Sequence, residues 1–183
     1  HGETDWNKER RNIGQIDVPL NETGIAQAKK IAEIFRHKKI DLVLSSDLSR
    51  ARETAQMIAK ACDAELTIDP EFKEINVGMA QGMLEDDSNK IHGHFWKGYE
   101  EPFPGGESWK EFEKRVWRAF SRHKGQHAHR NVVIVSHADA IKMLLKNLKQ
   151  LNPHETMNLA SNPHGSILEF AITEASCKKS GSD

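Results

Sequence analysis

Hydrophobic positions follow two alternating patterns along the chain. Apolar residues spaced three and four apart, with Asn21 as a cap for the first group, predict four helices. These helices cover residues 21–37, 48–59, 108–125 and 140–151. Short apolar runs predict buried strands at residues 40–46, 64–68, 131–136 and 166–172. This alternation predicts a three-layer α/β fold, with a mostly parallel sheet that has helices on both faces.

The remaining segments are polar or rich in glycine and proline. Residues 1–20 lack periodicity and read as loop, and residues 76–106 read as a long loop with some helix. Long loops of this kind usually cover a functional site. Residues 1–175 therefore form a single predicted domain, followed by a polar tail at 176–183.

Composition narrows the range of partners. The 183 residues include 26 Lys and Arg against 27 Asp and Glu, so the net charge of −1 offers no basic field for nucleic acid. The apolar runs are too short to cross a membrane, so we expect no membrane partner. The two cysteines, Cys62 and Cys177, lie far apart and suggest no disulfide framework. Two distant cysteines without a disulfide framework fit a reducing compartment, so we expect a cytoplasmic location.

Polar residues follow two of the predicted strands. His137 comes directly after the strand at 131–136, and Ser45, Ser46 and Arg50 come after the apolar part of the strand at 40–46. In parallel α/β sheets, sites lie at the carboxyl ends of the strands. We therefore expect these residues to face one cleft.

Two histidine pairs raise the question of a metal site. His92 and His94 form one pair, and His127 and His129 form the other. Neither has carboxylate or thiolate partners at a recognisable spacing. We interpret both as surface histidines and predict neither a metal nor a cofactor.

Seven segments, in order along the chain, resemble the motifs of one family. His1-Gly2-Glu3-Thr4 with Trp6 and Asn7 is the first, and Ser136-His137 after a strand is the last. Between them lie segments that match at 14–20, 24–28, 45–55, at Glu74 with Gly78 and Gly82, and at 106–108. The chain resembles the histidine phosphatase superfamily, the phosphoglycerate-mutase-like proteins. The resemblance implies the phosphoglycerate-mutase-like form of the α/β fold.

The resemblance also implies catalytic roles for three residues. His1 would be a nucleophile that is transiently phosphorylated, which divides one phosphoryl transfer into two displacements. His137 would be the second histidine of the phosphate pocket. Glu74 would protonate the leaving oxygen and then activate water.

Four further residues are implied as substrate-binding. Arg50 is the best-placed cation for the phosphoryl oxygens, and Arg11 is a second candidate. Asn7 would donate an uncharged hydrogen bond, and Gly2 would let the backbone approach the ligand. Taken alone, Arg50 could instead pair with Glu53 or Asp47 on a helix surface.

The chain departs from the family pattern in two places. The family has an apolar strand that ends in arginine directly before the nucleophile, and the sequence here begins at His1. We expect the native protein to contain that strand. Ala138 follows His137 where many relatives have glycine, and we expect this change to be tolerated.

The leading functional hypothesis is a metal-independent phosphatase that hydrolyses a small phosphomonoester through phosphohistidine and releases phosphate. Cofactor-dependent phosphoglycerate mutase ranks second. Members of that group have basic residues in this region that hold a second phosphate and a carboxylate. Residues 83–105 here hold only Lys90 and Lys97 as fixed cations, beside five acidic residues and two histidines. A noncatalytic module that binds a phospho-ligand or a protein is the third hypothesis. A homodimer is compatible with each of them.

Overall fold

The computed structural model describes residues 1–92, 98–157, 159 and 163–169. Three strands and seven α-helices are seen among these residues, together with the two 3-10 turns η1 (Pro70–Phe72) and η2 (Gly78–Ala80). The strands are β1 (Leu42–Ser45), β2 (Glu65–Ile68) and β3 (Val132–Val135). The helices are α1 (Asp5–Lys8), α2 (Glu22–Phe35), α3 (Ser49–Cys62), α4 (Glu85–His92), α5 (Trp109–Gln126), α6 (Ala138–Lys149) and α7 (Pro153–Met157).

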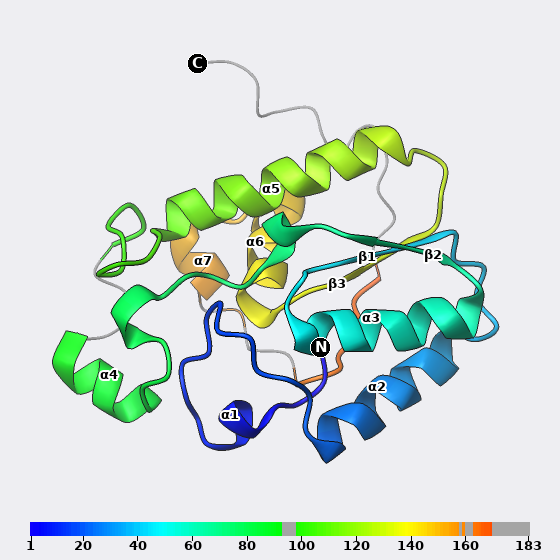
Figure 1. Ribbon diagram of the computed structural model, residues 1–183. Helices are drawn as coiled ribbons and strands as arrows, with labels where there is room; N and C mark the ends of the chain where they lie inside the picture. The colour runs from blue at the N-terminus through cyan, green and yellow to red at the C-terminus, as the bar shows by residue number, and fades with distance from the viewer. Residues whose placement is uncertain (93–97, 158, 160–162, 170–183) are drawn as a thin grey trace.

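The three strands form a parallel sheet in the order β2-β1-β3. The register pairs Leu42 with Glu65 and Val132, and it pairs Ser45 with Ile68 and Val135. All four residues of β1 are buried, because β1 has a strand on each side and helices above and below. The parallel sheet with flanking helices confirms the predicted fold class (Figure 1).

Alternate residues of β1 face opposite layers of the molecule. Leu42 and Leu44 belong to a core with α5 and α6, whereas Val43 belongs to a second core with α2 and α3. Successive strand side chains point to opposite faces, so one apolar run serves both layers. This period explains why an unbroken apolar run predicts a strand covered on both sides.

Two of the four predicted helices, α2 and α5, start at side-chain caps. The Asn21 side chain accepts a hydrogen bond of 2.8 Å from the Gly24 N–H at the start of α2. Ser108 and Glu111 form a reciprocal capping box at the start of α5. These caps satisfy N–H groups that the first helical turn leaves without partners. All four long helices predicted from periodicity are confirmed within a few residues at each end.

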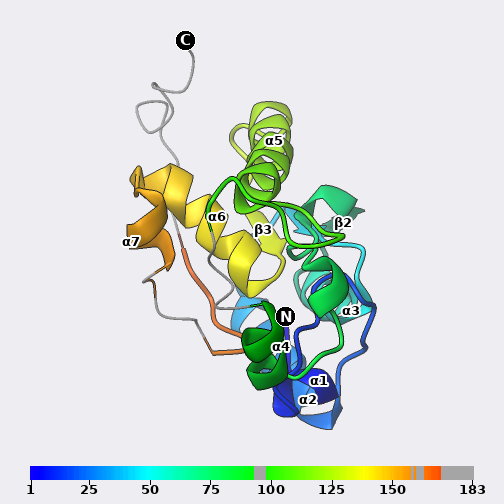
Figure 2. The same ribbon diagram turned by 90° about the vertical axis from the view of Figure 1, so that its left-hand side faces the viewer.

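Three differences from the predicted elements stand out. Residues 1–20 were expected to be loop but include α1, and the helix α7 was not expected at all. The strand predicted at 166–172 was wrong over 166–169, which have no regular structure, while 170–172 lie outside the described residues, as does the tail at 176–183. The segment at 163–169 runs back along the molecule, past the side of α2 (Figure 2).

No helix among the described residues is both long enough and apolar enough to cross a membrane. Within the same residues, β3 pairs only with β1, so its other side carries no strand.

Candidate active site

The carboxyl ends of β1 and β3 bring two buried side chains together. His137 follows β3 as the N-cap residue of α6, and Ser46 follows β1. His137 Nε2 lies 2.9 Å from Ser46 Oγ, while its Nδ1 is buried and has no partner among the described residues. Burial first, and then the positive charge of Arg50, lower the pKa of His137 well below its usual value. His137 is therefore a neutral ring at physiological pH, with one nitrogen free for a ligand.

His1 lies beside His137. The centroids of the two rings are 5.0 Å apart, and the His1 backbone nitrogen donates to the Ser136 carbonyl at 3.3 Å. His1 Nδ1 lies 2.7 Å from the Gly2 carbonyl oxygen. A carbonyl only accepts hydrogen bonds, so Nδ1 carries the proton in the neutral ring. The lone pair of His1 is therefore on Nε2.

Gly2 has a packing role that the sequence did not indicate. A Cβ atom at Gly2 would lie 2.3 Å from the backbone oxygen of Gly24, so no larger residue fits against the first turn of α2. The Gly2 N–H donates to Thr54 Oγ1 at 3.3 Å. Gly2 is buried, and its approach to the ligand stays a prediction.

Arg50, in the first turn of α3, is almost fully buried at 1% exposure. Its guanidinium donates to the Gly14 and Ile16 carbonyl oxygens at 2.8 and 2.9 Å. The alternative pairing with Asp47 or Glu53 is not seen, because these two carbonyls hold the guanidinium. A guanidinium has five N–H donors, so three remain for an anion. Burial lowers the pKa of Arg50 to about 10, which leaves it positively charged at neutral pH.

Glu74 follows η1 and reaches the same cleft. One carboxylate oxygen accepts from the Ile75 N–H at 3.0 Å, and the other accepts from the Asp139 N–H at 3.2 Å. Burial is the largest effect on its pKa, and the Asp139 carboxylate adds to it, whereas the two N–H groups and Arg50 oppose it. The result is a pKa raised to about 7. Glu74 can therefore both donate and accept a proton near neutral pH.

Arg115, on α5, is a residue that sequence reasoning missed. Its guanidinium donates to the carbonyl oxygens of Glu71, Lys73 and Glu74, at 2.7, 3.2 and 3.1 Å. It also makes a paired contact with the Glu107 carboxylate, 2.6 Å at its shorter distance. These bonds fix the backbone that carries Glu74. Nothing in the sequence pattern of α5 indicates them, because all these partners lie outside that helix.

Asn7 and Arg11 line the cleft with His1 and Glu74. Asn7 Oδ1 accepts from the Thr4 N–H at 3.0 Å, so its amide nitrogen is the group left for a ligand. Arg11 donates to Glu9 at 2.5 Å and to the Gly82 carbonyl at 2.9 Å. Arg11 is therefore already paired with a carboxylate, whereas Arg50 is held by backbone carbonyls alone.

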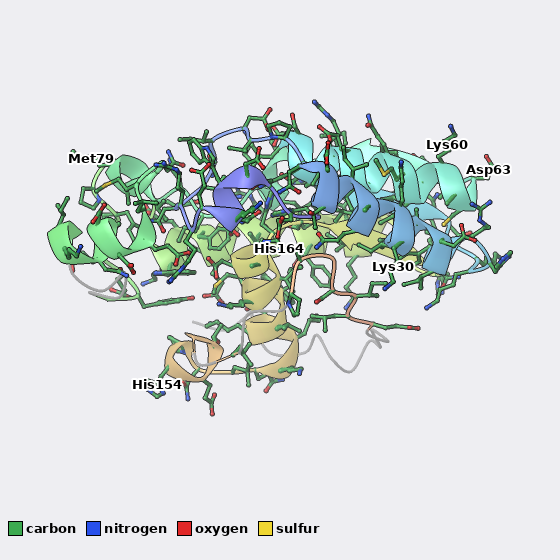
Figure 3. The ribbon with its side chains drawn as sticks, turned by 90° about the horizontal axis from the view of Figure 1, so that it is seen from below. Lys30, Lys60, Asp63, Met79, His154 and His164 are labelled. Atoms are coloured by element: carbon green, nitrogen blue, oxygen red, sulfur yellow. The ribbon has the colours of Figure 1, made fainter. Side chains whose placement is uncertain are left out.

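His164 also approaches the site, although the sequence gave no reason to expect it. Its ring centroid is 5.8 Å from that of His1, and the Gly165 N–H donates to the His1 carbonyl at 3.1 Å. Figure 3 shows His164 on the face of the molecule that is seen from below. Burial lowers its pKa below the usual value.

A metal centre finds no support in the described part of the chain. No group of three or more His, Cys, Asp or Glu side chains there could hold a metal ion. His127 stacks on His123, with centroids 5.7 Å apart. The other pair involves His94, which lies outside the described residues.

Two adjacent histidine rings, a buried arginine with spare donors and a carboxyl whose pKa is raised to about 7 are groups typical of phosphate-binding sites of the histidine type. Comparison with known proteins agrees with this class. The model of the histidine phosphatase superfamily (branch 1) matches residues 1–181, and the chain belongs to that family.

The chain is similar to phosphoglycerate mutase-like protein 4 of Arabidopsis thaliana, with 38% identity over 152 residues. That match covers 79% of this chain and 66% of the plant protein, just under two thirds of its length. Two solved phosphatases share the fold. A mycobacterial glucosyl-3-phosphoglycerate phosphatase in complex with VO3 has a TM-score of 0.83 and 26% identity, covering 91% of this chain and 85% of that one. The alpha-ribazole phosphatase of Shigella flexneri has a TM-score of 0.79 and 26% identity, covering 90% and 84%.

Proposed function

We propose that the protein hydrolyses small phosphomonoesters through a phosphohistidine formed on His1. The observation that carries this proposal is the hydrogen bond between His1 Nδ1 and the Gly2 carbonyl. It fixes the tautomer whose Nε2 lone pair can attack phosphorus, in the cleft that also holds Arg50 and Glu74. The similarity to two solved phosphatases supports the same reaction class.

The first step transfers the phosphoryl group to the enzyme. The Nε2 lone pair of His1 forms a bond to phosphorus while the bond to the ester oxygen breaks. That oxygen takes the bonding electron pair and receives the proton of Glu74, so an alcohol leaves. A pKa of about 7 keeps a substantial share of Glu74 protonated for this step.

The second step returns the enzyme to its starting state. The Glu74 carboxylate takes a proton from water as the water oxygen bonds to phosphorus. The N–P bond breaks and its electron pair returns to His1 Nε2, so inorganic phosphate is released. The same carboxyl thus serves as acid and then as base.

The charge that develops on the phosphoryl oxygens needs fixed donors. Arg50 offers three unused N–H groups, the buried Nδ1 of His137 has no protein partner, and the Asn7 amide nitrogen faces the same cleft. We propose that these groups stabilise the transferring phosphoryl group without a metal ion.

Mutase activity is a second candidate, because the name of the plant relative refers to phosphoglycerate mutase. A mutase must hold a second anionic group on its substrate. Lys90, one of the two cations in residues 83–105, is paired with Asp87 at 3.2 Å. This pairing favours the phosphatase over the mutase.

The test is turnover of p-nitrophenyl phosphate with and without EDTA, combined with trapping of phosphohistidine by a rapid quench without acid. We expect turnover that EDTA does not reduce, and a phosphohistidine that is lost in His1→Asn. His129→Asn is the matched control, because His129 has a φ of +73°, which asparagine tolerates well. Its activity should equal that of the wild type.

Three results would each overturn part of the proposal. Activity lost in EDTA and restored by a divalent ion would contradict the metal-independent route. Faster interconversion of phosphoglycerates than hydrolysis would favour the mutase. Tight phosphate binding without turnover would favour the noncatalytic module.

A further inference from the structure

One wall of the cleft is a short antiparallel ribbon, made of residues 10–12 and 82–85. Arg11 pairs with Leu84 across it. The Asn12 N–H donates to the Met83 carbonyl at 2.9 Å, and the Gly82 N–H donates to the Asn12 carbonyl at 2.8 Å. These two backbone bonds fix Asn12 on both sides. The helix α4 continues directly from the ribbon, so the backbone bonds of the ribbon also fix the position of α4 relative to Asn12.

Both arginines of this wall already have a carboxylate partner. Arg10 pairs with Glu85 at 3.1 Å, and Arg11 pairs with Glu9 at 2.5 Å. An anionic group on a substrate would have to compete with these carboxylates for each arginine. The ribbon is therefore poorly suited to a leaving group that carries a carboxylate or a second phosphate.

Two neutral amides on this wall are different. Asn12 Nδ2 and Asn89 Oδ1 are buried atoms, and neither has a hydrogen-bond partner among the described residues. Both asparagines line the cleft that contains His1 and Glu74. A buried polar atom without a partner is unfavourable, because it has lost its hydrogen bonds to water. One of these atoms is a donor and the other is an acceptor, so the pair calls for a group that both accepts and donates.

A hydroxyl group is the chemical partner that fits such a pair. It donates one hydrogen bond and accepts others, so it can satisfy Asn12 and Asn89 in either orientation of their amides. An alkyl leaving group would leave both atoms unsatisfied, and a carboxylate could only accept.

We propose that Asn12 and Asn89 form a leaving-group subsite that selects neutral, hydroxyl-bearing phosphomonoesters, such as phosphorylated polyols and sugars. This inference rests on the proposed phosphatase function, because the leaving group is defined by that reaction. It adds a substrate class to the reaction, and it separates this protein from enzymes whose substrates carry a second anion.

The experiment compares two substrates that have the same three-carbon skeleton. Glycerol 1-phosphate carries two hydroxyls that n-propyl phosphate lacks, and both have the same alkyl leaving oxygen. We expect kcat/KM to favour glycerol 1-phosphate in the wild type, and Asn12→Leu and Asn89→Leu each to reduce that preference about 3- to 10-fold, as expected for one neutral hydrogen bond. Gln56→Leu, on the exposed side of α3, is the matched amide control and should keep the wild-type ratio.

Calorimetric binding to the His1→Asn variant provides a readout that does not depend on turnover. Its preference for glycerol 1-phosphate over n-propyl phosphate should fall when either leucine substitution is added. An unchanged ratio in both variants, or a wild-type preference for 3-phosphoglycerate over glycerol 1-phosphate, would overturn the subsite. Absence of turnover with the binding preference intact would count against the phosphatase function and leave the subsite standing. Because the two asparagines lie on different segments, a folding defect in one variant leaves the other as the test.

Discussion

Two walls of the same cleft are built in opposite ways. The wall at the strand ends holds Arg50 and His137, each 1% exposed, by bonds to backbone and buried hydroxyl groups. The wall formed by the ribbon and α4 is held by backbone bonds between two loop segments, and its ion pairs, such as Arg10 with Glu85, are exposed, with side chains 70% and 44% exposed. Sheet register positions the first wall, whereas local loop pairing positions the second.

This difference leads us to expect that the wall at the strand ends carries out the reaction and that the wall of the ribbon and α4 selects the substrate. A shift at the strand ends would require the parallel sheet to move, so the groups that we propose to meet the phosphoryl oxygens are rigidly placed. The ribbon can change its side chains without disturbing the core, because loops tolerate variation. Substitutions at the first wall should therefore alter rate and stability strongly, and those at the second wall mainly substrate preference.

The largest effect is expected from Glu74→Gln. The amide keeps the shape of the side chain but cannot donate a carboxyl proton, so hydrolysis of an alkyl phosphate should fall about 10²- to 10⁴-fold. An aryl phosphate has a leaving oxygen that needs little protonation, so its transfer to His1 should fall less. Phosphohistidine should then accumulate, because the base that activates water is also lost. Stopped-flow release of p-nitrophenol and a rapid quench measure these two steps.

Equal losses on alkyl and aryl phosphates, with no trapped phosphoenzyme, would remove Glu74 from the acid role. Glu107 is a poor candidate to replace Glu74 as the acid, since its carboxylate is held by Arg115 at 2.6 Å.

Much of the first wall could be predicted from the sequence. His137 and Arg50 each follow a strand that its apolar run identifies, and parallel strands place their carboxyl ends at one edge. The partners of Arg50 could not be predicted, because the Gly14 and Ile16 carbonyls come from a loop without periodicity. Backbone carbonyls are present at every residue, so no residue type marks the ones that are used.

The second wall was largely hidden from sequence reasoning. The helix α1 has four residues, too few for a helical period, although the reciprocal capping of Thr4 and Asn7 was a local signal for it. Asn12 and Asn89 are 77 positions apart (89 − 12). Only the tertiary pairing of the ribbon shows that both line one cleft. Arg115 was missed for the same reason, since its carbonyl partners lie on another segment.

The pH dependence of stability should also depend on Glu74. Its pKa is about 7 in the folded protein against an ordinary value of 4.5, so the folded state binds more protons between these two values. Stability should therefore fall as pH rises from about 4.5 to about 7, by on the order of 2–3 kcal/mol. Glu74→Gln removes this loss. The variant should gain melting temperature relative to the wild type at pH 8 and gain much less at pH 5, as measured by calorimetry. An equal gain at both pH values would show that the Glu74 pKa is not raised.

Arg115→Lys tests whether the backbone under Glu74 must be held by a guanidinium. Lysine cannot reproduce the fork that spans three carbonyls and Glu107, so we expect a loss of about 1–3 kcal/mol in unfolding free energy. The kcat for alkyl phosphates should fall with it, because the acid is displaced. Arg118→Lys, on an exposed part of the same helix, should leave the urea midpoint unchanged. A wild-type midpoint and kcat in Arg115→Lys would mean that the Glu74 segment holds its position without the fork.

The smallest effect is expected at the ion pair between Arg10 and Glu85. Both side chains are largely exposed, so solvent screens their attraction and their ordering costs side-chain entropy. A double-mutant cycle of Arg10→Gln and Glu85→Gln in urea should give a coupling of about 0–1 kcal/mol, which falls further in 1 M salt. The backbone bonds of the ribbon should hold it in place without the pair, since the Glu85 N–H donates to the Arg10 carbonyl at 2.9 Å. A coupling above about 2 kcal/mol that resists salt would mean that this wall is as firmly built as the strand ends, and the division between a rigid chemical wall and an adjustable selective wall would fail.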